Sequence, residues 1–165
     1  MHTYKDLESF KYWSITDKDY FSISVIKGLV MDAVRKANSG HPGGAMSSAD
    51  FIYLLFKDYL KFDPKDPEWF DRDRFILSGG HMSMLQYSVL HLIGWMKLSE
   101  LKKFRQFGSS TPGHPEVEIP GVECTTGPLG QGFAMGVGMA LAEAYLSNII
   151  SIDNEDSGAL VDHFT

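Results

Sequence analysis

The sequence predicts an α/β domain, organised as an incomplete doubly wound parallel sheet flanked by helices. Three observations predict it: segments with helical apolar spacing alternate with short apolar runs, those runs end near glycine, and a glycine-rich turn leads directly into a long helix. The 165 residues are 44% hydrophobic and 22% charged, which is typical of a folded globular chain. Residues 1–165 are therefore interpreted as a single domain.

Composition excludes several classes of protein. The chain has 15 Lys and Arg against 21 Asp and Glu, a formal net charge of -6, and no dense basic run, so nucleic acid is not an expected partner. Cys124 stands alone, which fits a reducing cytoplasm. Residues 1–10 carry charges where an export signal needs an apolar centre. The uncharged apolar tract 132–142 is shorter than the roughly 20 residues of a bilayer span, so no membrane partner is expected.

Two amphipathic helices are expected in the first sixty residues. Residues Tyr20 to Asn38 carry apolar side chains at every fourth position, and Gly40 is placed to end that helix. Residues Phe51 to Leu60 indicate a second, more deeply buried helix. The start signals are approximate capping pairs, Thr16 with Asp19 and Ser47 with Asp50.

Short apolar runs predict the strands. Residues Arg74 to Ser78 form one strand that leads into Gly79-Gly80-His81, and Leu160 to Thr165 begin another. Between them, residues Phe107 to Gly130 are rich in Gly, Pro, Ser and Thr, and a loop of this length in a compact domain is usually either functional or disordered. We interpret it as functional because of an anchor in its middle. Gly121 to Thr125 offer a strand-like anchor within that loop.

The remaining helices lie on either side of this loop. Residues Met82 to Ile93 predict one helix, Ser99 to Phe104 a short charged one, and Gln131 to Leu146 a third. Small residues occupy opposite sides of the third helix, which predicts close approach on both sides and a place between layers. Residues 147–159 are interpreted as a polar loop.

Three histidines share a setting of glycine and proline. His41 lies in Ser-Gly-His-Pro-Gly, His81 in Gly-Gly-His-Met-Ser and His114 in Pro-Gly-His-Pro-Glu. Imidazole exchanges protons near neutral pH, so loops that hold it rigidly suit proton transfer. Two alternatives remain: exposed histidines without a role, and a three-histidine zinc site, which the spacing disfavours because it contains no short chelating pair. His91, on a helix, is interpreted as structural.

Residues Gly127 to Gly132 form a glycine-rich turn that runs into a helix. Backbone N–H groups at such a turn bind anions, and glycine allows a cofactor to approach the backbone. The turn lacks the Gly-Lys-Ser/Thr ending of a Walker loop and the glycine order of the dinucleotide fingerprint. A tight turn with close helix packing explains the same glycines.

Taken together, four ordered motifs resemble the N-terminal part of the transketolase family, from about Ile26 to Leu146. They are Ser39-Gly40-His41-Pro42-Gly43, Leu77-Ser78-Gly79-Gly80-His81, Thr111-Pro112-Gly113-His114-Pro115-Glu116, and Gly121-Val122-Glu123-Cys124-Thr125-Thr126-Gly127-Pro128-Leu129-Gly130-Gln131-Gly132. The resemblance implies a thiamine-diphosphate enzyme that transfers two-carbon ketol units between sugar phosphates, as a cytoplasmic homodimer.

The same resemblance implies the roles of individual residues. His41 would contact substrate and assist proton transfer, and His114 would bind a hydroxyl of the donor sugar, so both are candidate catalytic and substrate-binding residues. His81 would lie beside the cofactor diphosphate. Gly127, Pro128 and Leu129 would form the loop that seats the cofactor rings.

The family's metal motif, Gly-Asp-Gly followed by Asn, does not occur in these 165 residues. We therefore expect no metal ligand within this chain, although the complete enzyme would use Mg²⁺ or Ca²⁺. The chain is interpreted as a partial domain, an N-terminal fragment that is inactive alone. Two alternatives stay open: part of a split or deoxyxylulose-phosphate-synthase-like enzyme, and a non-catalytic remnant that binds an intact subunit.

Overall fold

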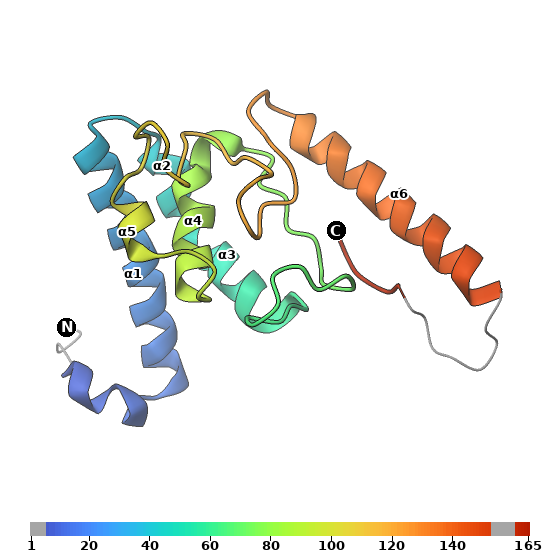
Figure 1. Ribbon diagram of the computed structural model, residues 1–165. Helices are drawn as coiled ribbons and strands as arrows, with labels where there is room; N and C mark the ends of the chain where they lie inside the picture. Colours follow the sequence, from blue (N-terminus) through green and yellow to red (C-terminus); the bar gives the residue numbers. More distant parts are fainter. Residues whose placement is uncertain (1–5, 153–160) are drawn as a thin grey trace.

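The computed structural model describes residues 6–152 and 161–165, and in these the chain is helical (Figure 1). Helices α1 to α4 gather at one end of the molecule, and the long α6 extends from the other side. The elements in chain order are the 3₁₀ helix η1 (Leu7–Tyr12), α1 (Ile15–Ala37), α2 (Pro42–Ser47), α3 (Ala49–Leu54), the π-helical η2 (Leu55–Tyr59), the 3₁₀ helix η3 (Gly80–Met82), α4 (Ser83–Leu92), α5 (Leu98–Leu101) and α6 (Gln131–Ile152).

Helix α1 begins and ends at different residues from those expected. Its N-cap is Ser14, whose hydroxyl accepts a hydrogen bond from the backbone N–H of Asp17 at 3.1 Å. Its C-cap is Asn38, which adopts the left-handed conformation at φ 48°. Asparagine tolerates this conformation because its short polar side chain bonds locally. The helix is therefore confirmed, whereas the capping pair Thr16 with Asp19 and the terminal role of Gly40 are wrong.

The hydrophobic core lies among α1, α2, α3 and α4, which pack against one another. Helix α4, expected as Met82 to Ile93, is its centre: every residue from Ser83 to Leu90 is buried. The helix expected over Phe51 to Leu60 is present as α3 followed directly by η2. Fully buried core residues from three of these helices are Ile26, Val30, Ala49, Tyr87 and Leu90.

The expected parallel sheet is wrong: among residues 6–152 and 161–165 there is no strand, and a single isolated bridge joins Asp63 to Asp66. The two apolar runs expected as strands do lie near each other. Only one backbone hydrogen bond joins them, from the N–H of Arg74 to the carbonyl of Phe164 at 2.8 Å. A strand pair requires a repeated ladder of such bonds, so these runs are extended chain and not a sheet.

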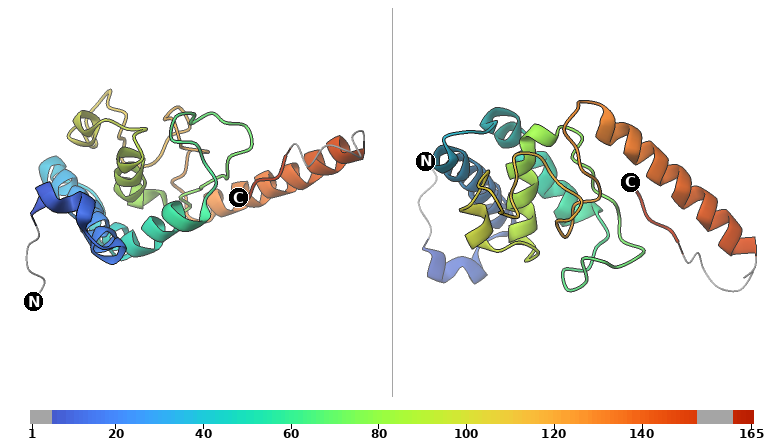
Figure 2. Two further views of the ribbon diagram at one scale, coloured as in Figure 1. Left: turned by 90° about the horizontal axis from the view of Figure 1, so that it is seen from below. Right: turned by 45° about the horizontal axis from the view of Figure 1, so that its top comes forward.

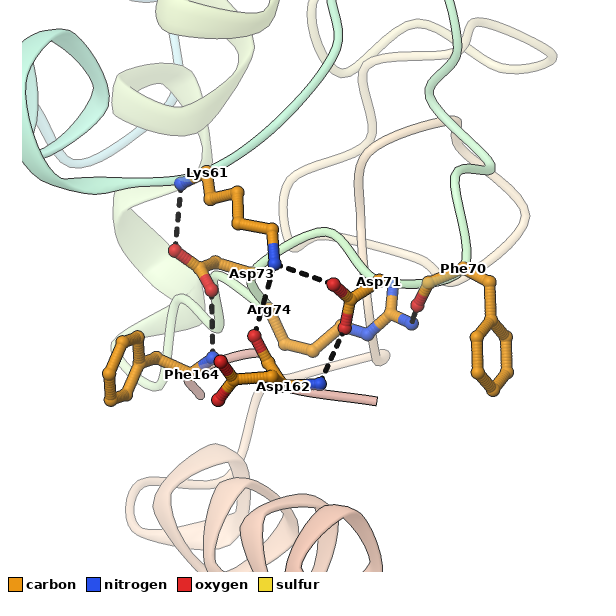
Figure 3. A network of polar contacts seen from close by, with 7 residues as sticks. All are labelled: Lys61, Phe70, Asp71, Asp73, Arg74, Asp162 and Phe164. Atoms are coloured by element: carbon orange, nitrogen blue, oxygen red, sulfur yellow. Dashed lines mark hydrogen bonds and ion pairs between the residues drawn. The ribbon is translucent and has the colours of Figure 1, made fainter. Parts of the chain in front are cut away.

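Side chains take the places that a ladder would need (Figure 3). The backbone N–H groups of Asp162 and Phe164 donate to the carboxylates of Asp71 and Asp73, both at 2.7 Å. Lys61 bridges the same region through Asp71 and the carbonyl of Asp162. The C-terminal segment is thus attached mainly by side-chain acceptors. The strand-like anchor expected at residues 121–125 is likewise loop.

Helix α6 extends away from the four-helix core in each view (Figures 1 and 2). Its first turns touch the rest of the chain, where the N–H of Phe133 donates to the hydroxyl of Ser78 at 3.0 Å. Farther along, apolar side chains are exposed, among them Leu141 at 71%. The expected place between two layers is therefore wrong. The helix also includes residues 147–152 of the expected polar loop, while residues 153–159 lie outside the described residues.

Residues Gln131–Ile150 are long and apolar enough, by length and composition, to cross a bilayer, with a mean hydropathy of 1.4. The 11-residue tract read from the sequence ends at Ala142 because Glu143 follows, yet this single charge does not interrupt α6. A core helix of a soluble protein passes the same test. The expectation of no membrane partner stays a prediction.

Candidate functional site

The structure brings the loops of His41 and His81 together through the packing of α2 on η3. A Cβ on Gly44, in α2, would lie 2.6 Å from the sulfur of Met82, the residue after His81. A larger residue here would force the Met82 side chain to move. The rings of His41 and His81 consequently lie edge to face, with centroids 5.3 Å apart and planes at 74°.

A second close approach brings the glycine-rich turn to the same place. A Cβ on Gly80 would lie 2.7 Å from the backbone oxygen of Thr126, so glycine is needed here. The Thr126 hydroxyl donates to the carbonyl of Leu77 at 2.8 Å and fixes the turn against the segment that precedes His81. Gly127 follows directly, and a Cβ built on it would be 3.8 Å from Cδ2 of His114. Gly127 therefore lies against the His114 ring.

Side chains of α4 anchor the loop that carries His114. The hydroxyl of Ser83 donates to the carbonyl of Gly113 at 2.9 Å, and the hydroxyl of Tyr87 lies within 3.2 Å of the carbonyl of His114. Tyr87 is fully buried, and this burial raises the pKa of its phenol. A neutral phenol keeps its proton for these bonds, so the loop is anchored by the core of the molecule.

The protonation of His114 reflects its neighbours. Partial desolvation of the imidazole lowers the pKa of His114 below its ordinary value, and the positive charge of Arg105 lowers it further, with interactions from His41 and His81 acting in the same direction. The lowered pKa favours the neutral ring. A neutral imidazole accepts or donates a hydrogen bond, as a group that binds a hydroxyl requires.

Solvent reaches the site from an open depression of about 580 Å³. His114, Gly127 and Pro128 line it together with Gln131 at the start of α6. Leu129, beside them, is 77% exposed. His41 and His114 are exposed and His81 is half-buried. The loops that carry the six candidate site residues are thus in contact with one another, pair by pair.

The zinc alternative finds no support in this geometry. Within residues 6–152 and 161–165, no three His, Cys, Asp or Glu side chains are grouped so that they could hold a metal ion. His91 is also accounted for, because its Nδ1 lies 2.8 Å from the carbonyl oxygen of Met96 in the turn after α4. That contact is typical of a structural histidine.

Comparison with known proteins decides the family. The family described as "Transketolase, thiamine diphosphate binding domain" matches residues 18–165. The chain belongs to the transketolase family. It is 58% identical to Transketolase 2 of Escherichia coli over 144 residues, which is 86% of this chain and 21% of that protein. It is 53% identical to the chloroplastic transketolase of Zea mays over 147 residues, which is 87% of this chain and 21% of that protein.

Solved transketolase structures agree. The enzyme from Leishmania mexicana superposes with a TM-score of 0.84 at 46% identity, covering 89% of this chain and 22% of that one. A transketolase from Pichia stipitis, in complex with sedoheptulose-7-phosphate, superposes with a TM-score of 0.76 at 52% identity, covering 79% of this chain and 19% of that one. The chain thus spans about a fifth of the length of the transketolases it matches.

Arg105, which is not among the residues predicted from the sequence, lies at this site in the structure. Its Nη1 donates to the hydroxyl of Ser39 at 2.7 Å, two residues before His41 in the sequence. No local pattern marks this arginine, because its partner lies 66 residues away. The sequence offered one signal for Arg105, which is that it lies only nine residues before the candidate residue His114.

Proposed function

We propose that this chain forms the N-terminal part of the thiamine-diphosphate site of a transketolase that transfers two-carbon ketol units between sugar phosphates. One observation carries the proposal: within a domain that matches the thiamine-diphosphate-binding family, four separate segments converge on a single site. These segments supply His41, His81, Gly127 and His114.

The residues present fit the cofactor. Gly127 and Pro128 line an open depression, and the exposed Leu129 beside them offers an apolar side chain to a ring. His81, half-buried against His41, offers a ring nitrogen to a diphosphate. We assign His81, Gly127, Pro128 and Leu129 to the cofactor.

Thiamine diphosphate, when bound, supplies the nucleophilic carbon and the electron sink for breaking a carbon–carbon bond. This chain's own task is to orient the substrate and move protons. We assign that task to His41 and His114, which lie on exposed loops at the site. The lowered pKa of His114 favours its neutral form, and a neutral imidazole can bind a sugar hydroxyl and accept its proton.

Further features of the complete enzyme follow the family. Sugar phosphates are the proposed substrates, and the Pichia stipitis relative in complex with sedoheptulose-7-phosphate supports that class. We propose Mg²⁺ or Ca²⁺ as the metal, held by residues outside this sequence, and a cytoplasmic homodimer as the assembly. The 165-residue chain by itself is expected to form no product, because it lacks the family's Gly-Asp-Gly motif.

A chimera tests the proposal. Residues 18–152 replace the matching segment of the Escherichia coli relative, and ketol transfer from xylulose phosphate to ribose phosphate is measured with thiamine diphosphate and magnesium. We expect activity. A chimera that folds but neither binds the cofactor nor transfers the ketol unit would favour the non-catalytic alternative.

Histidine variants of the active chimera test the individual roles. His81→Ala should weaken cofactor affinity, His114→Ala the handling of donor sugar, and His41→Ala turnover with less effect on cofactor affinity. Loss of one positioned acid or base typically costs about 100- to 10,000-fold in rate. The measurements are cofactor affinity and steady-state kinetics. His91→Gln is the control, because His91 lies near the C-terminal end of α4, whereas His81 lies just before the start of that helix. Three identical profiles would contradict the assignment.

A further inference from the structure

Arg105 occupies a constrained position between two of the site loops. Its backbone adopts the left-handed conformation, φ 59°, which is uncommon for residues other than glycine. Its N–H donates to the carbonyl of Thr111 at 2.9 Å, and Thr111 is itself fully buried and bonded to the carbonyl of Glu100. These bonds fix the position of the Arg105 backbone, from which the side chain extends.

That side chain touches both histidine loops. Its Nη1 donates to the hydroxyl of Ser39, in the loop of His41. On the other side, a Cβ built on Gly113 would meet Nε, Cζ and Nη2 of Arg105 at 3.0 to 3.2 Å. Three nearly equal distances mean that a face of the guanidinium covers Gly113, the neighbour of His114. Its Nε is buried without a hydrogen-bond partner among the described residues.

The charge of Arg105 also reaches the histidine. Arg105, His114 and Glu116 line a second open depression, separate from the one that Gly127 and Pro128 line. The positive charge of Arg105 is the second cause, after partial desolvation, of the lowered pKa of His114, ahead of His41 and His81. An arginine stays charged throughout the physiological range, so this influence does not vary with pH.

We propose that Arg105 is a positioning residue that ties the loop of His41 to the loop of His114 and fixes the surroundings of the His114 imidazole. The inference rests on the proposed function, because it concerns residues assigned to that reaction. Arginine is suited to the role because its planar fork bonds through one edge while its face packs on a backbone.

The test uses the 165-residue chain without cofactor or substrate. The pKa of His114 is followed by NMR titration, and amide exchange is followed at Ser39, whose N–H donates to the carbonyl of Val34 at 3.3 Å. Arg105→Met removes both charge and hydrogen bond, so it should raise the pKa of His114 and speed exchange at Ser39. Arg105→Lys keeps the charge and should hold the pKa of His114 below that in Arg105→Met.

Two further variants leave Arg105 intact. Ser39→Ala removes the hydroxyl acceptor, so it should speed exchange of the residue 39 amide without raising the pKa of His114. Gly113→Ala should push the guanidinium away from its face contact and raise the pKa of His114. Arg35→Met, an exposed arginine in the last turn of α1, is the matched control and should change neither measurement.

An unchanged His114 pKa in folded Arg105→Met would overturn the proposal. So would exchange at residue 39 that matches the parent in both Arg105→Met and Ser39→Ala. If Arg105→Met does not fold, Arg105→Lys, Ser39→Ala and Gly113→Ala decide by the same two measurements. Because no measurement needs cofactor or substrate, failure here is distinguishable from failure of the chimera assay.

Discussion

At the scale of single residues, one glycine determines whether α6 can dock on the chain. A Cβ on Gly132 would lie 2.7 Å from the backbone Cα of Ser78 and 2.9 Å from the Thr126 side chain. Backbone atoms cannot move away from an added Cβ as the end of a flexible side chain can. Gly138, six residues farther along the same helix, has nothing within 4 Å of its ideal Cβ.

The two glycines therefore predict opposite effects of the same substitution. Gly132→Ala should lower the free energy of unfolding by about 1–3 kcal/mol, or displace the start of α6, because of steric overlap. Gly138→Ala should stabilise α6 by about 1 kcal/mol, because alanine is the better helix former. Chemical denaturation and amide exchange within α6 measure both. Equal effects of the two variants would contradict the close contact.

At the scale of elements, α1 depends on a cap that lies before its apolar repeat. Ser14 and Asp17 bond reciprocally at its first turn, through the Ser14 hydroxyl and the Asp17 backbone and carboxylate. The helix then supplies the buried residues Ile23, Ile26, Val30 and Ala33 to the core. The first turn contributes none of these buried side chains, so its stability depends on the cap and not on packing in the core.

Ser14→Ala should lower the free energy of unfolding by about 1 kcal/mol, because the first turn loses its side-chain acceptor. Ser24→Ala is the matched control in the same helix. Ser24 is exposed and its hydroxyl bonds the carbonyl of Tyr20, a bond that the helix does not need. This control should leave stability unchanged or raise it by about 0.5 kcal/mol. Denaturant melts of the two variants give the comparison.

At the scale of the whole molecule, residues 161–165 are joined to the rest by a small polar network (Figure 3). Asp71 accepts from the N–H of Asp162, and Lys61 pairs with the same carboxylate. The N–H of Asp162 first, and Lys61 second, lower the pKa of Asp71 below its ordinary value. The carboxylate form thus favours attachment of the C-terminal segment.

The lowered pKa fixes the direction of the pH effect. Attachment should be complete above the unfolded carboxyl pKa of about 4 and should be lost as pH falls through the lowered value in the folded chain. Amide exchange at Asp162 is measured between about pH 5 and pH 2 and divided by the intrinsic exchange rate of an unprotected amide at each pH, and this ratio should rise as Asp71 becomes protonated. Asp71→Asn should attach the segment more weakly at every pH and remove this titration. A pH response that persists in Asp71→Asn would assign it to another group.

The sequence by itself determined the features that depend on neighbours in the chain. Helices close hydrogen bonds between residues four apart, so apolar spacing located α1 and α4 and the start of α6. The four motifs likewise revealed the family and named His41, His81 and His114 before any contact was known. The caps of α1 and the end of α6 were not predicted correctly, because apolar spacing carries little information about where a helix begins or ends.

Only the tertiary structure decided the contacts between distant segments. A strand needs a partner ladder from elsewhere in the chain, and around Arg74 the carboxylates of Asp71 and Asp73 accept the bonds that a ladder would use. The approach of His81 to His41 depends on glycines packed against other segments, and Arg105 meets Ser39 across 66 residues. Composition and periodicity carry no information about such pairings, because their energies depend on which surfaces meet after folding.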